Sequence, residues 1–255
     1  MTAAKYEWPT SLEPERYFEL IDSDTERMLE VGGLGLDAAV PSCPGWTVAD
    51  VVDHQAMVYS HKVRVMADNG WPDPWPPAEL TGRPPVEFLR EAKDAIFQEF
   101  ANHDVAEQTT TFGDDTSVMF WARRMALEVA VHRIDVELAH DAVTPIPDDL
   151  ATDGVDEILQ VMLHGNWAEW GAETKHPVDA AVAVETGGFR WRIAATEAIV
   201  DVVAGSSEPA DATVVGDPDD VFLWLWGRRG DDAVRVSGDK RAASELRERL
   251  AESGQ

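Results

Sequence analysis

The sequence is poor in cysteine, with Cys43 the single thiol in 255 residues. One cysteine cannot form an intrachain disulfide or a zinc site built from several thiolates, so we expect a reducing compartment. Basic residues are also scarce, since 21 Lys and Arg stand against 48 Asp and Glu and give a net charge of −27. A chain this acidic is unsuited to the phosphate backbone of a nucleic acid or to an anionic membrane.

Long apolar runs are missing as well. No uncharged apolar run approaches the roughly 20 residues that cross a bilayer, and Met1–Leu20 lacks the apolar segment of a secretory signal. We therefore predict a cytoplasmic protein with no membrane partner. The hydrophobic share of 44% is ordinary for a globular protein, and the length allows one large or two modest domains.

Four segments in the first part of the chain have the apolar periodicity of amphipathic helices. The predicted helices cover residues 15–31, 48–66, 86–102 and 118–140. Thr47 and Asp50 form a capping signal at the start of the second one. Four apolar stripes are buried most simply in a four-helix bundle. The Pro- and Trp-rich segment 69–85 is either a rigid connector or a lid over a pocket.

The predicted fourth helix carries polar chemistry on its apolar side. At about 100° per residue, one face holds Trp121, Met125, Glu128, His132 and Asp135. Burying carboxylates and an imidazole is costly unless they are paired or bind a metal. A Glu and a His four residues apart also form an ordinary pair on a partly solvated helix, so spacing alone leaves both interpretations open.

The other charges of this helix are expected to face water. They are Arg123, Arg133 and Glu137.

Two histidines of the predicted second helix, His54 and His61, lie on one apolar face. Seven residues at about 1.5 Å rise place them roughly 10.5 Å apart along the helix axis, which is too far for both to bind one ion. Only one of them can join Glu128 and His132 in a metal site. The helical spacing does not select between them.

The pattern changes after two prolines near residue 145. A predicted helix over residues 150–170 precedes β-rich runs, and Gly187-Gly188 indicates a hairpin between the first two. The further expected elements are strands at 180–185, 189–194, 199–203, 212–215 and 234–236, and helices at 217–226 and 240–252. The overall fold class is therefore predicted to be α+β, with a helical domain at residues 1–143 and a smaller α+β domain at 148–255.

The motifs SCPGWTVADVVDH, ALEVAVHRIDVELA and WGRR resemble the mycothiol-dependent maleylpyruvate isomerase family of actinobacteria. The resemblance implies a DinB-like metal-binding four-helix bundle followed by a domain similar to sterol carrier protein 2 (SCP2). It also implies a divalent metal, usually zinc, held by His54, Glu128 and His132, and so favours His54 over His61.

Two imidazoles and one carboxylate form the ligand set of a catalytic zinc site with an open position. The same set occurs in non-heme iron oxygenases, so ligand type alone does not fix the metal. The resemblance implies that mycothiol thiolate adds to the cis double bond of a small electrophile, after which bond rotation and elimination give the trans isomer. An S-transferase would keep the adduct. The alternative is a non-catalytic, metal-braced module that binds an apolar ligand or a partner chain, and either could be a monomer or a homodimer.

Other residues have weaker assignments. The resemblance favours Arg228, rather than Arg229 or a solvated helix end, as the catalytic residue that holds a substrate carboxylate. Asp135 is expected either to orient a ligand imidazole or to form a surface ion pair with an arginine. Cys43 is predicted to be a small buried hydrophobe rather than a nucleophile, and Trp46 a packing anchor. The histidines with no assigned role are His103, His140, His164 and His176.

Overall fold

The structure is a computed structural model, and it describes residues 10–166, 179–196 and 198–253. The chain divides into two compact units, Met1–Thr144 and Pro145–Gln255. The first unit is helical and the second combines helices with a sheet, so the predicted α+β class is confirmed.

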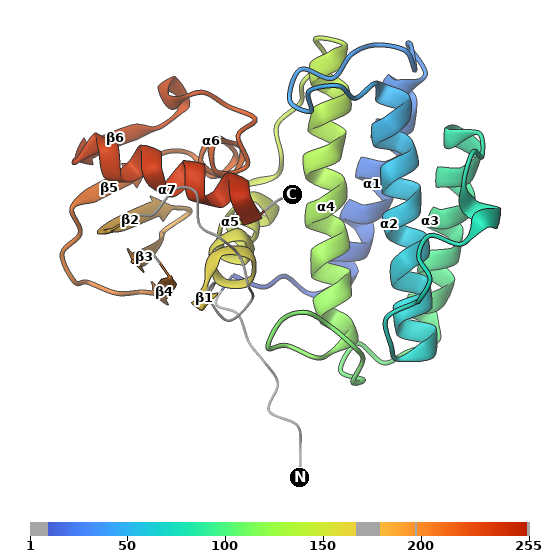
Figure 1. Ribbon diagram of the computed structural model, residues 1–255, viewed down its shortest axis with the longest axis horizontal. Coiled ribbons are helices and arrows are strands. Elements are labelled where there is room, and N and C mark those ends of the chain that lie inside the picture. Colours follow the sequence, from blue (N-terminus) through green and yellow to red (C-terminus); the bar gives the residue numbers. More distant parts are fainter. Residues whose placement is uncertain (1–9, 167–178, 197, 254–255) are drawn as a thin grey trace. The chain divides into compact units, whose positions relative to one another are not determined.

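The first unit contains four long helices that lie side by side (Figure 1). Helix α4 packs against α1 and α2, and α2 also packs against α3. The helices are α1 (Pro14–Gly32), α2 (Val48–Asp68), α3 (Pro85–Ala101) and α4 (Val118–Ala139). All four predicted helices are confirmed, with ends that differ by at most two residues from the predicted ones.

Local sequence signals set the ends of α2. The Asp50 carboxylate accepts a hydrogen bond from the Thr47 backbone N–H at 2.7 Å, and the Thr47 hydroxyl accepts one from the Asp50 N–H at 3.4 Å. This reciprocal capping box satisfies backbone donors that the helix leaves unpaired. At the other end, Asn69 has a left-handed conformation with φ of +46°, which stops the helix.

The expected exposure of three charged residues on α4 is wrong. Arg123, Arg133 and Glu137 retain only 3%, 2% and 0% of their accessible surface. Helix α4 is buried on nearly all sides, so its polar side chains do not follow the single-stripe pattern of an amphipathic helix.

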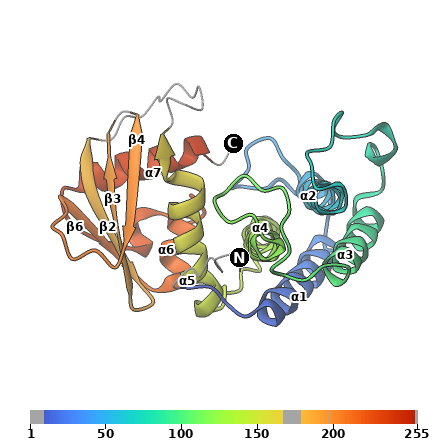
Figure 2. The ribbon, with the colours of Figure 1, turned by 90° about the horizontal axis from the view of Figure 1, so that it is seen from below.

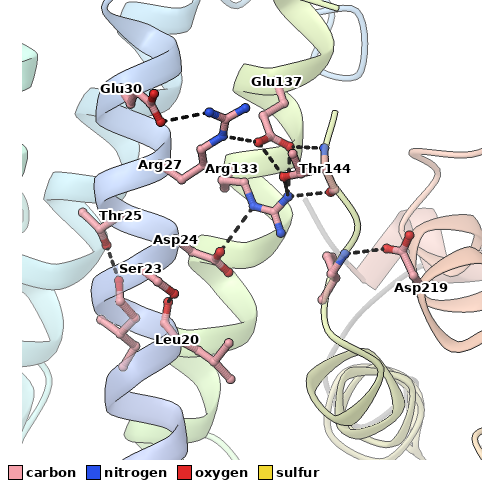
Figure 3. Close-up of polar contacts among 12 residues, drawn as sticks. Leu20, Ser23, Asp24, Thr25, Arg27, Glu30, Arg133, Glu137, Thr144 and Asp219 are labelled. Carbon is pink, nitrogen blue, oxygen red and sulfur yellow. Dashed lines mark hydrogen bonds and ion pairs between the residues drawn. The ribbon is translucent and has the colours of Figure 1, made fainter. Parts of the chain in front are cut away.

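Figure 3 shows the contacts that make this burial possible. The Arg133 guanidinium donates to Glu137 at 2.9 Å and to the Thr144 carbonyl at 2.7 Å. Arg27 of α1 donates to the other Glu137 oxygen at 2.8 Å, and Asp24 lies 3.4 Å from Arg133. Pairing with opposite charges offsets the cost of removing these groups from water. The network joins α1, α4 and the segment that follows α4.

The second unit is a six-stranded sheet with helices on one side (Figure 2). The strand order is β1-β4-β3-β2-β5-β6, and the β2–β5 pair is parallel while the other pairs are antiparallel. Its strands are β1 (Gly165–Asn166), β2 (Ala180–Thr186), β3 (Phe189–Ala195), β4 (Ile199–Ala204), β5 (Ala212–Val215) and β6 (Arg235–Gly238). Its helices include α5 (Asp148–Glu157), α6 (Pro218–Leu225) and α7 (Lys240–Ser253).

The predicted hairpin at Gly187-Gly188 is confirmed. Both glycines have positive φ, +58° and +82°, as a tight turn between antiparallel strands requires.

One predicted helix of this unit is too long. Helix α5 continues as a π-helical segment, η2 (Ile158–Leu163), and ends there instead of at residue 170. Gly165 has a φ of +139°, a conformation outside helical geometry, and it begins strand β1, which pairs with β4. Residues 167–170 of the predicted helix lie outside the described residues.

Within residues 10–166, 179–196 and 198–253, no helix is long and apolar enough to span a bilayer.

Candidate metal centre

Three potential metal ligands meet between α2 and α4. The Nε2 atom of His54 lies 3.3 Å from Oε1 of Glu128, and the Nε2 atom of His132 lies 3.4 Å from the same oxygen. One ligand atom from each residue lies within 4.8 Å of the others. Glu128 and His132 are one turn apart on α4, so a single helix face presents both to His54. The spacing and donor types suit one divalent ion.

The cluster is partly open to solvent. The side chain of His54 is 36% exposed, whereas Glu128 and His132 are 19% and 13% exposed. The ring centroids of Trp46 and His54 lie 5.3 Å apart. Trp46, which was predicted to be a packing anchor, therefore contacts a member of the cluster. His54 is therefore the member of the cluster that is most open to solvent.

A second layer of contacts fixes the orientation of His132. Its Nδ1 atom lies 2.9 Å from Oδ2 of Asp135, which is fully buried. Asp135 also accepts hydrogen bonds from Ser42 at 2.5 Å and from the Cys43 thiol at 3.5 Å. Asp135 is thus the acceptor that orients an imidazole, and the alternative of a surface ion pair is wrong. A carboxylate in this place raises the basicity of the ring and would hold Nε2 toward a metal bound at the cluster.

The ionisation of the cluster follows from its neighbours. Burial lowers the pKa of His132, but hydrogen bonds to Asp135 and Glu128 outweigh it and raise the pKa to about 9. Burial raises the pKa of Glu128, but the charge of Arg124, 2.7 Å away, and the two histidines hold it well below its usual value. Glu128 is therefore ionised at neutral pH and available as a carboxylate ligand.

His61 lies in different surroundings. Its ring contacts Trp71 and Trp75, with centroid distances of 5.9 and 4.7 Å, and Nδ1 lies 3.1 Å from the Lys62 amine. Burial and the Lys62 charge lower the pKa of His61 to about 4. The structure brings His54, and not His61, to Glu128 and His132.

Arg228 and Arg229 follow helix α6 in the second unit. Arg229 forms ion pairs with Asp219 at 2.6 Å and with Asp220. Arg228 donates to the Trp226 carbonyl at 2.7 Å. The ion pairs with Asp219 and Asp220 occupy the Arg229 guanidinium. The assignment of Arg228 to a substrate carboxylate stays a prediction.

The comparisons with known proteins cover both units. A model of the mycothiol maleylpyruvate isomerase N-terminal domain matches residues 18–137, and a model of the corresponding C-terminal domain matches residues 149–245. The chain belongs to the mycothiol-dependent maleylpyruvate isomerase family. The predicted resemblance is thereby confirmed.

Two solved structures of one enzyme support the same fold. A crystal structure of the mycothiol-dependent maleylpyruvate isomerase is 17% identical in sequence and has a TM-score of 0.62. The match covers 89% of this chain and 95% of the chain in that structure. A histidine-to-alanine mutant of that enzyme is 16% identical with the same coverage and a TM-score of 0.59. The sterol carrier protein domain 2 of Helicoverpa armigera is 17% identical and covers 44% of this chain and 96% of its own, with a TM-score of 0.31. No curated protein is a match in sequence.

Sequence reasoning missed the contacts of Asp135 with the segment before α2. The pattern placed Asp135 one turn beyond His132, which is a usable signal for a helical partner. It contained no signal for Ser42 and Cys43, since they reach Asp135 across more than 90 residues of sequence, with separations of 93 and 92 positions.

Proposed function

We propose that this protein is a metal-dependent enzyme that uses mycothiol to isomerise or S-conjugate a small electrophile. The observation that carries the proposal is the convergence of His54, Glu128 and His132, with His132 oriented by Asp135, in a member of this family. Zinc is the proposed metal because two imidazoles and one carboxylate are a catalytic zinc set. A bound metal would supply the acidity that makes a thiol into a thiolate at neutral pH.

Residues of both proposed domains contribute to metal binding and substrate recognition. In the metal-binding bundle, residues 1–143, the Arg124 guanidinium keeps Glu128 ionised, and Asp135 keeps the His132 Nδ1 proton in place. In the domain of residues 148–255, Arg228 is proposed to hold a carboxylate of the substrate by paired hydrogen bonds.

The isomerisation needs no redox partner. The thiol sulfur adds to one carbon of the cis double bond, and the electron pair of that bond moves to the adjacent conjugated carbonyl. Rotation about the resulting single bond, followed by elimination of the thiolate, restores the double bond in the trans form. In S-conjugation a proton instead adds to the other carbon of the former double bond, and the thioether is the product.

The test is turnover by the full-length, zinc-loaded protein with mycothiol and a panel of maleyl compounds, followed by NMR of the alkene protons. We expect conversion that requires both zinc and the thiol and that Glu128→Ala abolishes. Glu99→Gln is the matched control, because Glu99 also pairs with a histidine, His103 at 2.8 Å, but outside the cluster. Bound zinc without any thiol-dependent conversion would favour the non-catalytic binding module, and turnover that requires iron and dioxygen would favour the oxygenase.

A further inference from the structure

The loop that precedes α2 contacts both histidines of the metal cluster. The Ser42 hydroxyl donates to Oδ1 of Asp135 at 2.5 Å, and Oδ2 of the same carboxylate lies 2.9 Å from Nδ1 of His132. The ring centroids of Trp46 and His54 lie 5.3 Å apart. One short loop therefore touches one imidazole directly and reaches the other through Asp135.

Backbone hydrogen bonds hold this loop, residues 40–46, in shape. The Trp46 carbonyl accepts from the Val40 N–H at 3.0 Å. Inside the loop, the Cys43 N–H donates to the Val40 carbonyl at 3.2 Å and the Trp46 N–H donates to the Cys43 carbonyl at 3.0 Å. Gly45 has a φ of +88°, a conformation that suits glycine. The position of Ser42 is thus set by a closed loop that leads directly into α2.

The Ser42 hydroxyl and the His132 ring engage different oxygens of Asp135. Asp135 is fully buried, and a buried carboxylate is costly without hydrogen-bond donors. A hydroxyl-to-carboxylate bond of 2.5 Å is of the short, charge-assisted kind, whereas the Cys43 thiol, a weaker donor, lies 3.5 Å from Oδ2. Because Ser42 holds Oδ1, the carboxylate resists rotation about its Cβ–Cγ bond and keeps Oδ2 toward Nδ1 of His132.

We propose that Ser42 is a positioning residue of the metal centre, which fixes the His132 imidazole through Asp135. Without the hydroxyl the carboxylate is freer to rotate, so the imidazole loses part of the constraint that would present Nε2 to a metal. The inference rests on the proposed metal site and adds to it a residue from outside the two helices that supply the ligands.

The first test compares the zinc affinities of Ser42 variants of the full-length protein, by competition with a chromophoric chelator. We expect Ser42→Ala to lower the affinity by about tenfold, the low end for groups that support metal ligands. Ser42→Thr should bind zinc as the wild type does, because it keeps a hydroxyl. Ser60→Ala is the matched control, since the Ser60 hydroxyl donates to the Ala56 carbonyl within α2 at 2.9 Å. The control should leave the affinity unchanged.

The second test needs no metal. In the zinc-free protein, the NMR signal of the proton on Nδ1 of His132 reports the strength of its hydrogen bond to Asp135. We expect this signal to move in Ser42→Ala and to return to the wild-type position in Ser42→Thr. The ring signals of His103, which pairs with Glu99 outside the cluster, should stay in place in both variants.

A His132 signal that stays at the wild-type position in Ser42→Ala would overturn the inference, as would equal zinc affinities of that variant and a zinc-binding wild type. If Ser42→Ala fails to fold, Ser42→Val takes its place, because it differs from Ser42→Thr in lacking the hydroxyl. The NMR measurement also separates this inference from the proposed function. A moved His132 signal in Ser42→Ala, without zinc binding by the wild type, would leave the positioning role standing and remove the metal enzyme. Zinc- and thiol-dependent turnover by the wild type, with both readouts unchanged in Ser42→Ala, would do the reverse.

Discussion

The His132 imidazole and the Asp135 carboxylate are in contact at 2.9 Å, within one turn of α4. This contact assigns the Nδ1 atom of His132 to Asp135 and leaves Nε2 toward Glu128 at 3.4 Å. A helix supplies two members of the cluster and the group that orients one of them. The third member comes from α2, so the packing of α2 on α4 completes the site.

Replacing Asp135 should weaken metal binding without removing a ligand. Asp135→Asn keeps the size of the side chain but loses the charge that holds the Nδ1 proton of His132. We expect zinc affinity to fall by about 10- to 100-fold, as for other residues that support metal ligands. Competition with a chromophoric chelator measures the change. Glu99→Gln, which alters the His103 pair outside the cluster, should leave the affinity at the wild-type value.

Metal content should distinguish the two histidines of α2. We expect His54→Ala to lose zinc, because its Nε2 lies with Glu128 and His132, and His61→Ala to keep about one ion per chain. Elemental analysis of the purified proteins measures this, and zinc should raise the melting temperature of His61→Ala but not of His54→Ala. Zinc loss from His61→Ala alone would contradict the proposed ligand set.

The buried network around Glu137 predicts a large loss of stability. Glu137→Ala leaves Arg133 buried with Asp24, at 3.4 Å, as its remaining carboxylate neighbour, and breaking a buried pair costs about 3 kcal/mol or more. Glu30→Ala is the matched control, since it also removes a carboxylate paired with Arg27 but is 72% exposed. Its cost should stay below about 1 kcal/mol. Urea unfolding of both variants gives the comparison, and equal midpoints would contradict the prediction.

The sequence predicted the helices well because each has its own local signals. The capping box of Thr47 and Asp50 and the apolar periodicity of each helix require no knowledge of the rest of the fold. The hairpin at Gly187-Gly188 is local in the same sense. The end of α5 was harder, since the pairing of Gly165 with Val200 of β4 spans a long stretch of chain.

The candidate site shows the same difference between local signals and contacts that are distant in sequence. Helical spacing put Glu128, His132 and Asp135 on one face, and the family resemblance selected His54 from the two histidines of α2. The burial of Arg133 and Glu137 was missed because it depends on which groups lie near them in space. Their partners Arg27 and Asp24 lie on another helix.

The chemistry should depend on an added thiol and not on Cys43. The Cys43 thiol is half-buried and donates to Asp135 at 3.5 Å, and the same carboxylate also accepts from Ser42 and contacts His132. A thiolate there would bring two negative charges together, which is unfavourable. Cys43→Ser replaces one hydrogen-bond donor to Asp135 with another, so the orientation of His132 should persist.

We therefore expect Cys43→Ser to keep at least about half of the wild-type rate with mycothiol present, since the exchange preserves a donor of similar size. The wild-type protein should show no conversion without a thiol cofactor. The measurement is initial rate against mycothiol concentration for both proteins, with Asp135→Asn as the variant expected to lose rate at limiting zinc. Thiol-independent conversion that disappears in Cys43→Ser would mean that Cys43 is the nucleophile, and the role of Asp135 would then be to contact that thiol.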